Sequence, residues 1–257
     1  MSTGRPHTQG NVKRTASGQE RRMIKFLLML AAVCALVILV RGRIYVLREI
    51  EVTGNSKKSV SEIAGRSGLQ LGMNIFNVDE REVERNLLND PYVELLKVRV
   101  ELPDTVVLEV RERSACAAIN CAGVILLTDQ EGYILERLTG VPQDGNFVVV
   151  SGMDVSIGHQ GNAIESGVPG QKAAMSAVLQ AIHESGMERE ISELNVADMD
   201  NLYLVSDHGI QVLLGDETNL NDKFAWMRAV MDRLKQDGVM SGVLDLSSGK
   251  NAVYADR

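Results

Sequence analysis

The stretch LKVRVELPDTVVLEVRER, residues 96–113, alternates apolar and charged side chains on both sides of one turn signal, Pro103-Asp104. Successive residues of a strand point to opposite faces of a sheet, so this alternation predicts two strands with one face on a core and one in water. The short turn between them predicts a hairpin. The residues expected on the core face of the first strand are Leu96, Val98, Val100 and Leu102.

The residues before this hairpin predict one further strand and two short helices. Residues 46–52 alternate as a strand and end at the turn signal Gly54-Asn55. Ser59 is expected to cap a short helix, and residues 69–76 to form an extended, half-buried connection. A second helix opens with a capping-box pattern at residues 79–82 and is expected to place Val83, Leu87 and Leu88 on the core. The order β-α-α-β-β over residues 46–113 predicts a compact α+β module.

Upstream of this module, residues 23–40 form an apolar run of eighteen residues whose only charge is Lys25. A helix of this length covers about 27 Å, close to the hydrocarbon thickness of a bilayer. A cleaved signal peptide is the alternative, but the run is longer than a usual signal core and Arg41-Gly-Arg43 follows it in place of small residues. We therefore interpret the run as a single uncleaved transmembrane anchor.

Charge is distributed unevenly along the chain. Residues 1–43 hold eight Lys and Arg against one Glu, a net charge of +7, so the remainder carries −14 of the overall −7. Six of the basic residues precede the apolar run or lie at its start, which predicts a cytoplasmic N-terminus and extracytoplasmic C-terminal domains. Residues 1–22, polar and poor in large apolar side chains, are expected to be a disordered tail. An acidic main body disfavours nucleic-acid binding.

Residues 115–257 predict a second mixed α/β domain with a mainly antiparallel sheet. A strand-turn-strand unit surrounds residues 129–132, and the Gly-rich residues 151–170 are expected to form a loop. The other strands are expected at residues 147–150, 191–196, 203–205, 210–214, 243–246 and 252–255. One helix is expected to end at Gly186, and a second to cover residues 220–236 with Asn219 as its cap.

The sequence offers no convincing catalytic, metal or cofactor site. The histidines are scattered without ligand spacing, and residues 247–250 lack the Walker pattern. The pairs Asp198/Asp200 and Asp216/Glu217 are interpreted as solvated charge, because carboxylates this close together are common in so acidic a body. Cys116 and Cys121 are interpreted as free thiols, with a small disulfide as the alternative.

Several phrases together resemble the FtsQ/DivIB family of bacterial division proteins. VLREIEVTGN (residues 46–55), NIF (74–76), DPYV (90–93) and residues 102–113 resemble the family's POTRA domain. LTDQEG (127–132), VLLG (212–215) and GVLDL (242–246) resemble its second, β domain. The resemblance covers residues 23–257 and is weakest over residues 140–170.

This resemblance implies a non-enzymatic scaffold of the divisome, located at the septum in the cytoplasmic membrane. In the family, the far end of the second domain binds FtsB or DivIC, which arrives as a coiled coil with FtsL, and the complex regulates septal peptidoglycan synthesis by FtsW and FtsI. An exposed strand edge suits such binding, because a partner strand can extend its backbone ladder. Two roles stay open for the Tyr254 ring: contact with the partner, or cover of its own core. By resemblance, the partner-binding residues are Leu246, Ser247, Ser248, Ala252, Val253 and Tyr254.

Two other functions remain as alternatives. A POTRA-containing secretion or outer-membrane assembly component would carry a β-barrel, whose ten-residue alternating strands the sequence does not show. A membrane-anchored cell-wall hydrolase would use some of the scattered carboxylates. The sequence leaves open the envelope type, the stoichiometry and affinity of partners, an activating or inhibiting role, and the part that residues 151–170 play.

Overall fold

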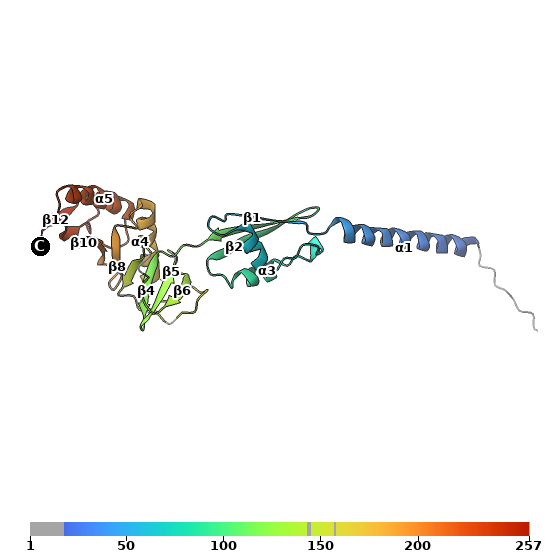
Figure 1. The fold of residues 1–257 in the computed structure, drawn as a ribbon, viewed down its shortest axis with the longest axis horizontal. Coiled ribbons are helices and arrows are strands. Elements are labelled where there is room, and N and C mark those ends of the chain that lie inside the picture. Colours follow the sequence, from blue (N-terminus) through green and yellow to red (C-terminus); the bar gives the residue numbers. More distant parts are fainter. Residues whose placement is uncertain (1–17, 143–144, 157, 257) are drawn as a thin grey trace, which may run out of the picture. The chain divides into compact units, whose positions relative to one another are not determined.

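The computed structural model describes residues 18–142, 145–156 and 158–256, and within its first helix the side chains of residues 21–38 and 43–44 (Figure 1). Most of the expected tail lies outside these residues, but residues 18–22 are helical and not a disordered segment. The chain forms two compact units. Within the described residues, the first comprises 18–50, 70–78 and 100–107, and the second comprises 51–69, 79–99 and the residues from 108 on.

Helix α1 (Gly18–Ile44) is the main element of the first unit. The large apolar side chains described along it are exposed, among them Met23, Phe26, Leu28 and Ile38. Among the described residues, no helix combines the length and the apolar character that crossing a membrane requires.

The elements that follow confirm the predicted order β-α-α-β-β. They are β1 (Glu49–Thr53), α2 (Val60–Arg66), α3 (Glu80–Leu87), β2 (Val93–Glu101) and β3 (Thr105–Glu112), and the strands form a sheet in the order β1-β3-β2. Ser59 caps α2 as predicted, because its Oγ accepts the Glu62 N–H at 3.2 Å. Asp79 caps α3 by accepting from the Arg81 N–H at 3.0 Å.

The predicted core face of the first strand of the hairpin is wrong, whereas that of the second strand is buried as expected. Leu96, Val100 and Leu102 are 58%, 43% and 58% exposed, and Leu88, also expected in the core, is 52% exposed. The central strand β3 is the buried one instead, with Val106, Val107, Leu108 and Val110 all inaccessible. The reason is geometric: β2 lies at the sheet edge and spans about 30 Å, whereas α2 and α3 are each only about 10–12 Å long and cannot cover all of it.

The connection between α2 and α3 also differs from the prediction of an extended, half-buried segment. Residues Ile75–Asn77 form a short 3-10 helix, η1, capped by the Asn74 side chain. Ile75 is fully buried, whereas Leu71 and Phe76 are 65% and 48% exposed.

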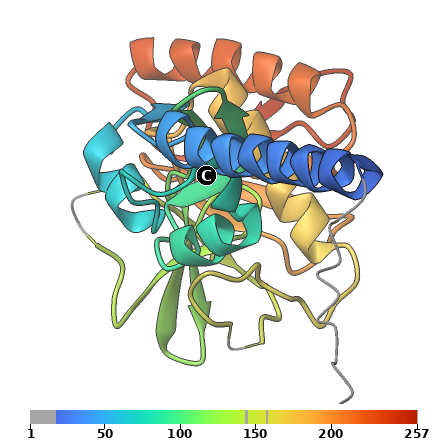
Figure 2. The same cartoon turned by 90° about the vertical axis from the view of Figure 1, so that its right-hand side faces the viewer.

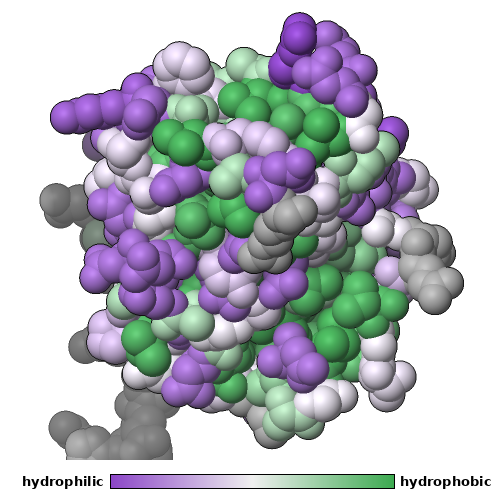
Figure 3. Space-filling view, turned by 90° about the vertical axis from the view of Figure 1, so that its left-hand side faces the viewer, coloured by the Kyte–Doolittle hydropathy of each residue, from purple (hydrophilic) through white to green (hydrophobic). Residues whose placement is uncertain are grey.

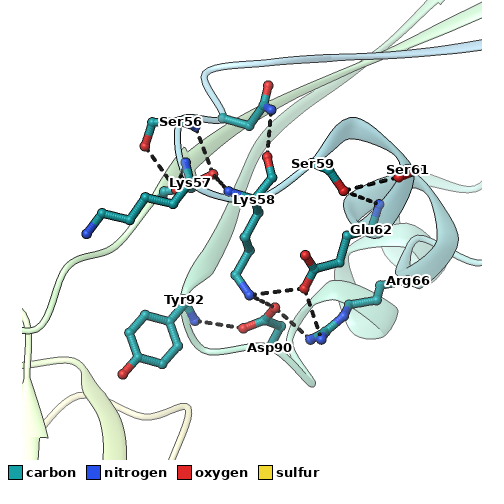
Figure 4. Close-up of polar contacts among 11 residues, drawn as sticks. Ser56, Lys57, Lys58, Ser59, Ser61, Glu62, Arg66, Asp90 and Tyr92 are labelled. Atoms are coloured by element: carbon teal, nitrogen blue, oxygen red, sulfur yellow. Dashed lines mark hydrogen bonds and ion pairs between the residues drawn. The ribbon is translucent and has the colours of Figure 1, made fainter.

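A charged network fastens α2 to the end of α3 (Figure 4). The Asp90 carboxylate, which is only 5% exposed, accepts from Lys58 Nζ at 2.8 Å and from Arg66 Nη1 at 2.6 Å. Its other oxygen accepts the Tyr92 N–H at 3.2 Å, and Glu62 lies 3.3 Å from Lys58 and 3.2 Å from Arg66. The Asp-Pro-Tyr phrase is therefore a structural junction of this module.

The second module is built on a sheet of nine strands in the order β12-β11-β10-β9-β8-β7-β4-β5-β6. Among the described residues, five of its eight pairings are antiparallel, which confirms the mainly antiparallel prediction. The strands are β4 (Ala117–Cys121), β5 (Val124–Thr128), β6 (Ile134–Leu138), β7 (Val148–Ser151), β8 (Ile191–Asn195), β9 (Leu202–Ser206), β10 (Ile210–Gly215), β11 (Gly242–Asp245) and β12 (Val253–Ala255).

Two helices, α4 (Gln171–Ser185) and α5 (Leu220–Gln236), pack against each other and share one core with the sheet (Figure 2). Helix α4 ends at Gly186, whose left-handed conformation closes the last turn. Helix α5 has the predicted bounds, but Asn219 makes no side-chain cap and instead adopts a left-handed conformation, with φ of 54°.

Candidate functional site

Strand β12 is one edge of the nine-stranded sheet and pairs antiparallel with β11, with Leu244 opposite Tyr254 and Asp245 opposite Val253. Among the described residues, β11 is the only segment that forms a backbone ladder with it. The outer side of β12 therefore presents backbone N–H and C=O groups along which another strand can pair.

The six residues predicted for this site fall into three groups. Val253 and Tyr254 lie on the edge strand, and Ala252 directly precedes it. Val253 is 54% exposed, whereas Ala252 and Tyr254 are half-buried. Ser247 and Ser248 are exposed in the preceding turn, where their hydroxyls bond to Asp245 and Asn251.

The sixth predicted residue, Leu246, is not part of an accessible edge. It is 1% exposed, and its N–H donates to the Leu213 carbonyl at 2.9 Å. Leu246 therefore belongs to the core of the sheet.

Tyr254 packs back on its own domain. Its hydroxyl donates to the Ser241 carbonyl at 2.5 Å, and its ring lies over Gly242, where an added Cβ would sit 2.4 Å from Tyr254 Oη. Partial burial, together with the nearby Asp256 carboxylate, raises the pKa of Tyr254. The structure thus gives Tyr254 a role in holding β12 on β11, and the half-exposed remainder of the ring stays available at the surface.

At the opposite edge of the sheet, the start of β6 is paired with the loop whose role the sequence left open. The Ile134 N–H donates to the Asn162 carbonyl at 2.8 Å, and the Gly161 N–H donates to the Ile134 carbonyl at 2.9 Å. Gln160 Nε2 donates to the Leu135 carbonyl at 2.9 Å, and Tyr133 forms an antiparallel bridge with Ala163. Of the two edge strands, β12 is thus the one along which no loop pairs within the described residues.

Apolar side chains are exposed near β12 in small areas. Met240, two residues before β11, is 54% exposed, as is Val253. Figure 3, which faces the end of the chain that carries β12, shows hydrophobic areas separated by strongly hydrophilic ones. A surface of this kind suits a partner that combines backbone pairing with a few apolar contacts.

The acidic pairs noted in the sequence act within turns. Asp216 accepts from the Thr218 hydroxyl at 2.6 Å and from Lys223 Nζ at 3.1 Å, and these bonds lower its pKa to about 2. Asp198 accepts from Asn201 Nδ2 at 2.7 Å, and this bond together with a backbone N–H lowers its pKa. The described part of the chain holds no group of three or more side chains suited to a metal ion.

A cavity of about 230 Å³ in the second unit is lined by Arg113, Cys116 and Asp129, with His183 at its wall. Arg113 is ion-paired to Asp129 and lies 4.2 Å from the Tyr133 ring centroid. Burial raises the pKa of the Cys116 thiol to about 12, so that the thiol stays protonated and is a poor nucleophile. Cys116 and Cys121 are free thiols, as interpreted from the sequence.

Comparisons with known proteins agree with this architecture. A family model described as "POTRA domain, FtsQ-type" matches residues 46–113, and one described as "Cell division protein FtsQ/DivIB, C-terminal" matches residues 119–247. The cell division protein FtsQ of Corynebacterium glutamicum is 30% identical over 186 residues, covering 72% of this chain and 78% of that protein. The cell division protein DivIB of Clostridium tetani is 24% identical over 212 residues, covering 79% and 77%.

A solved structure, the major extracytoplasmic domain of DivIB from Geobacillus stearothermophilus, is also similar. It is 15% identical, with a TM-score of 0.31, and the match covers 49% of this chain and 97% of that one. A similarity this low does not by itself support an assignment.

Proposed function

Because this chain belongs to the FtsQ/DivIB family of cell division proteins, we propose that it is a non-enzymatic scaffold of the divisome. In this proposal it crosses the cytoplasmic membrane once, binds an FtsB/DivIC-like protein together with an FtsL-like protein, and helps to regulate septal peptidoglycan synthesis by FtsW/FtsI-type enzymes. The observation that carries the proposal is the contrast between the two edge strands: β6 is paired at its start with a loop, whereas among the described residues the backbone ladder of β12 is with β11 alone.

Membrane anchoring rests on residues 23–40, an apolar run with one charge, Lys25, which is near enough to the end to reach the interface. The exposed apolar side chains along α1 support it, because a helix that is apolar on all sides needs an apolar surrounding. The basic residues at its N-terminal side favour a cytoplasmic N-terminus.

Partner binding is assigned to β12 and the side chains around it. A strand from the FtsB/DivIC-like protein would pair along the outer side of β12, and Val253 supplies an exposed apolar contact on the same strand. Tyr254 would act mainly through its bond to Ser241, which fixes β12 in place to receive the partner.

A binding assay with the full-length protein in detergent or nanodiscs tests this assignment. We expect Val253→Asp to weaken capture of the purified FtsB/DivIC–FtsL coiled coil about tenfold or more, because the charge would be desolvated in the interface. Leu88→Asp is the matched control, since Leu88 is 52% exposed and lies at the end of α3, far from β12 in sequence. Equal effects of the two changes would refute the site.

Hydrogen exchange on the same complex gives an independent readout. We expect the β12 amides to become protected when the partner binds, and Tyr254→Phe to weaken binding less than Tyr254→Ala, since phenylalanine keeps the ring that covers Gly242. Circular dichroism of each variant establishes that the fold is kept. Binding without any new protection on β12 would contradict strand addition.

A further inference from the structure

Among the residues that the structure describes in the first unit, five large apolar side chains are exposed outside the body of α1. We call them the juxtahelical cluster. Ile44 is the last residue of α1, Leu71 and Phe76 lie in the segment around η1, and Val100 and Leu102 lie at the turn of the β2–β3 hairpin. Their exposed fractions are 49%, 65%, 48%, 43% and 58%. Such a concentration on a soluble surface is costly unless something covers it.

Backbone hydrogen bonds bring these segments to the end of α1. Residues that directly follow the helix pair with the η1 segment: Ile75 N–H donates to Tyr45 O at 3.0 Å, and Leu47 N–H to Met73 O at 2.8 Å. The hairpin turn joins the same stretch, because Arg48 N–H donates to Asp104 O at 2.8 Å. All three segments are thus tied to residues within a few positions of Ile44 (Figure 1).

The composition of these segments resembles that of a membrane interface. The rings of Tyr45 and Phe76 lie 5.2 Å apart, and residues 70–78 carry no charge. Aromatic residues gather at the level of the lipid headgroups, where an apolar ring body and a polar tip are both satisfied. Ile44 belongs both to the cluster and to α1, whose described apolar side chains are exposed as far as Ile38.

We propose that the juxtahelical cluster is a lipid-binding surface that lies in the interfacial layer of the bilayer entered by α1. This inference rests on the membrane anchoring put forward under the proposed function. The cluster would hold the hairpin turn and the η1 segment against the membrane surface.

Apolar contact, and not charge, would drive this binding. Residues 43–49, 70–78 and 100–104, which contain the cluster, carry two basic residues, Arg43 and Arg48, and three acidic ones, Glu49, Glu101 and Asp104. Arg48 is moreover paired with Asp104 at 3.6 Å. We therefore expect the interaction to form on zwitterionic phosphatidylcholine and to depend little on salt.

Tryptophan scanning of the full chain in phosphatidylcholine nanodiscs tests the proposal. The chain has one tryptophan, Trp226, so Trp226→Phe provides a silent background. Leu71→Trp and Leu102→Trp then place a probe in the cluster. Quenching by lipids brominated near the glycerol end of their acyl chains reports contact with the interfacial layer.

Two further probes make the result decisive. Leu96→Trp is the matched control, because Leu96 is 58% exposed like Leu102 but lies six residues, about 20 Å, away along β2. Val33→Trp, in the middle of α1, reports whether the helix itself enters the bilayer and is quenched by lipids brominated near the methyl end.

We expect quenching at residues 71 and 102, with a blue-shifted emission, and none at residue 96. If residue 33 is quenched and neither 71 nor 102 is, the lipid-binding surface is refuted while the anchor stands. If residue 33 is not quenched, the anchor itself is refuted, and this inference with it. Equal quenching at residues 96 and 102, or its loss in high salt, would also overturn the proposal.

Discussion

Replacing Glu112 by glutamine removes the charge that holds the loop between β1 and α2. Glu112 Oε1 accepts the N–H groups of Ser56 and Lys58, each at 2.8 Å, and Oε2 accepts the Lys57 N–H at 2.8 Å and the Ser56 hydroxyl at 3.0 Å. Glutamine has one acceptor oxygen, and its NH₂ group cannot accept a hydrogen bond. Whichever way the amide lies, two of the four donors lose their partner.

The expected loss follows from the pKa of this carboxyl group. Burial opposes ionisation of Glu112, but the hydrogen bonds from Lys57, Lys58 and Ser56 outweigh it and lower the pKa from 4.5 to about 2. The full shift corresponds to about 3.4 kcal/mol, and the proximity of solvent reduces this to roughly 1–2 kcal/mol. Because the folded-state pKa is the lower one, the stabilisation is complete above about pH 4.5 and is lost as the pH falls toward 2.

Amide hydrogen exchange of residues 56–58 in the full chain measures this loss directly. We expect Glu112→Gln to lower their protection about 5- to 30-fold at neutral pH. Glu109→Gln is the control on the same strand, since Glu109 forms a surface ion pair with Arg99 at 2.9 Å and, within the described part of the chain, accepts no bond from the loop. Unchanged protection, or a Glu112 carboxyl that titrates near 4.5 by NMR, would refute the reasoning.

Three further predictions, two on substitutions and one on the reactivity of a thiol, have defined outcomes. Asp90→Asn leaves Lys58 and Arg66 without their carboxylate and should lower the free energy of unfolding by about 1–3 kcal/mol, measured by thermal unfolding. A smaller loss would mean that these ion pairs contribute no more than solvent-exposed ones. Gly242→Ala puts a Cβ 2.4 Å from Tyr254 Oη and forces a positive φ on alanine, so it should lower the hydrogen-exchange protection of the β12 amides. Part of this loss of protection should disappear in a Tyr254→Ala background. If the effects of the two substitutions on protection are fully additive, the clash between the new Cβ and the Tyr254 ring is excluded. Cys116 should resist iodoacetamide at pH 8 until the protein unfolds, and rapid alkylation of the folded chain would contradict its raised pKa.

Local features of the fold were readable from the sequence because short-range physics determines them. Ser59 directly precedes a helix whose first turn its hydroxyl can cap. The spacing of the apolar residues in 220–236 places them on one face of a helix. The prediction that Leu96, Val100 and Leu102 of the first hairpin strand are buried was wrong. Alternation of apolar and charged residues shows that the two faces of a strand differ, but it does not show which other elements cover them. The lengths of α2 and α3 limit how much of β2 they can cover, and Leu96 and Leu102 stay exposed.

The functional contrast between the sheet edges depends on contacts that no local pattern encodes. Residues 151–170 show no periodicity, yet Gly161 and Asn162 supply the backbone partners of β6 from across the chain. Resemblance to the family predicts six residues at this edge, and the structure shows that they are not equally accessible. Leu246 is core, and Tyr254 turns its hydroxyl toward Ser241, leaving Val253 as the exposed side chain on the strand.

The shortness of β12 limits what strand addition alone can contribute. Three residues, Val253–Ala255, allow roughly three backbone bonds to a partner, each with a net contribution of about 0.5–1.5 kcal/mol. Their sum falls well short of the roughly 8 kcal/mol that a micromolar complex requires. A partner that binds here must therefore also bury apolar surface next to the strand, and Val253 and Met240 are exposed where such contacts would form. In such a complex the edge would select the register and direction of the partner strand, while the side chains would supply most of the affinity.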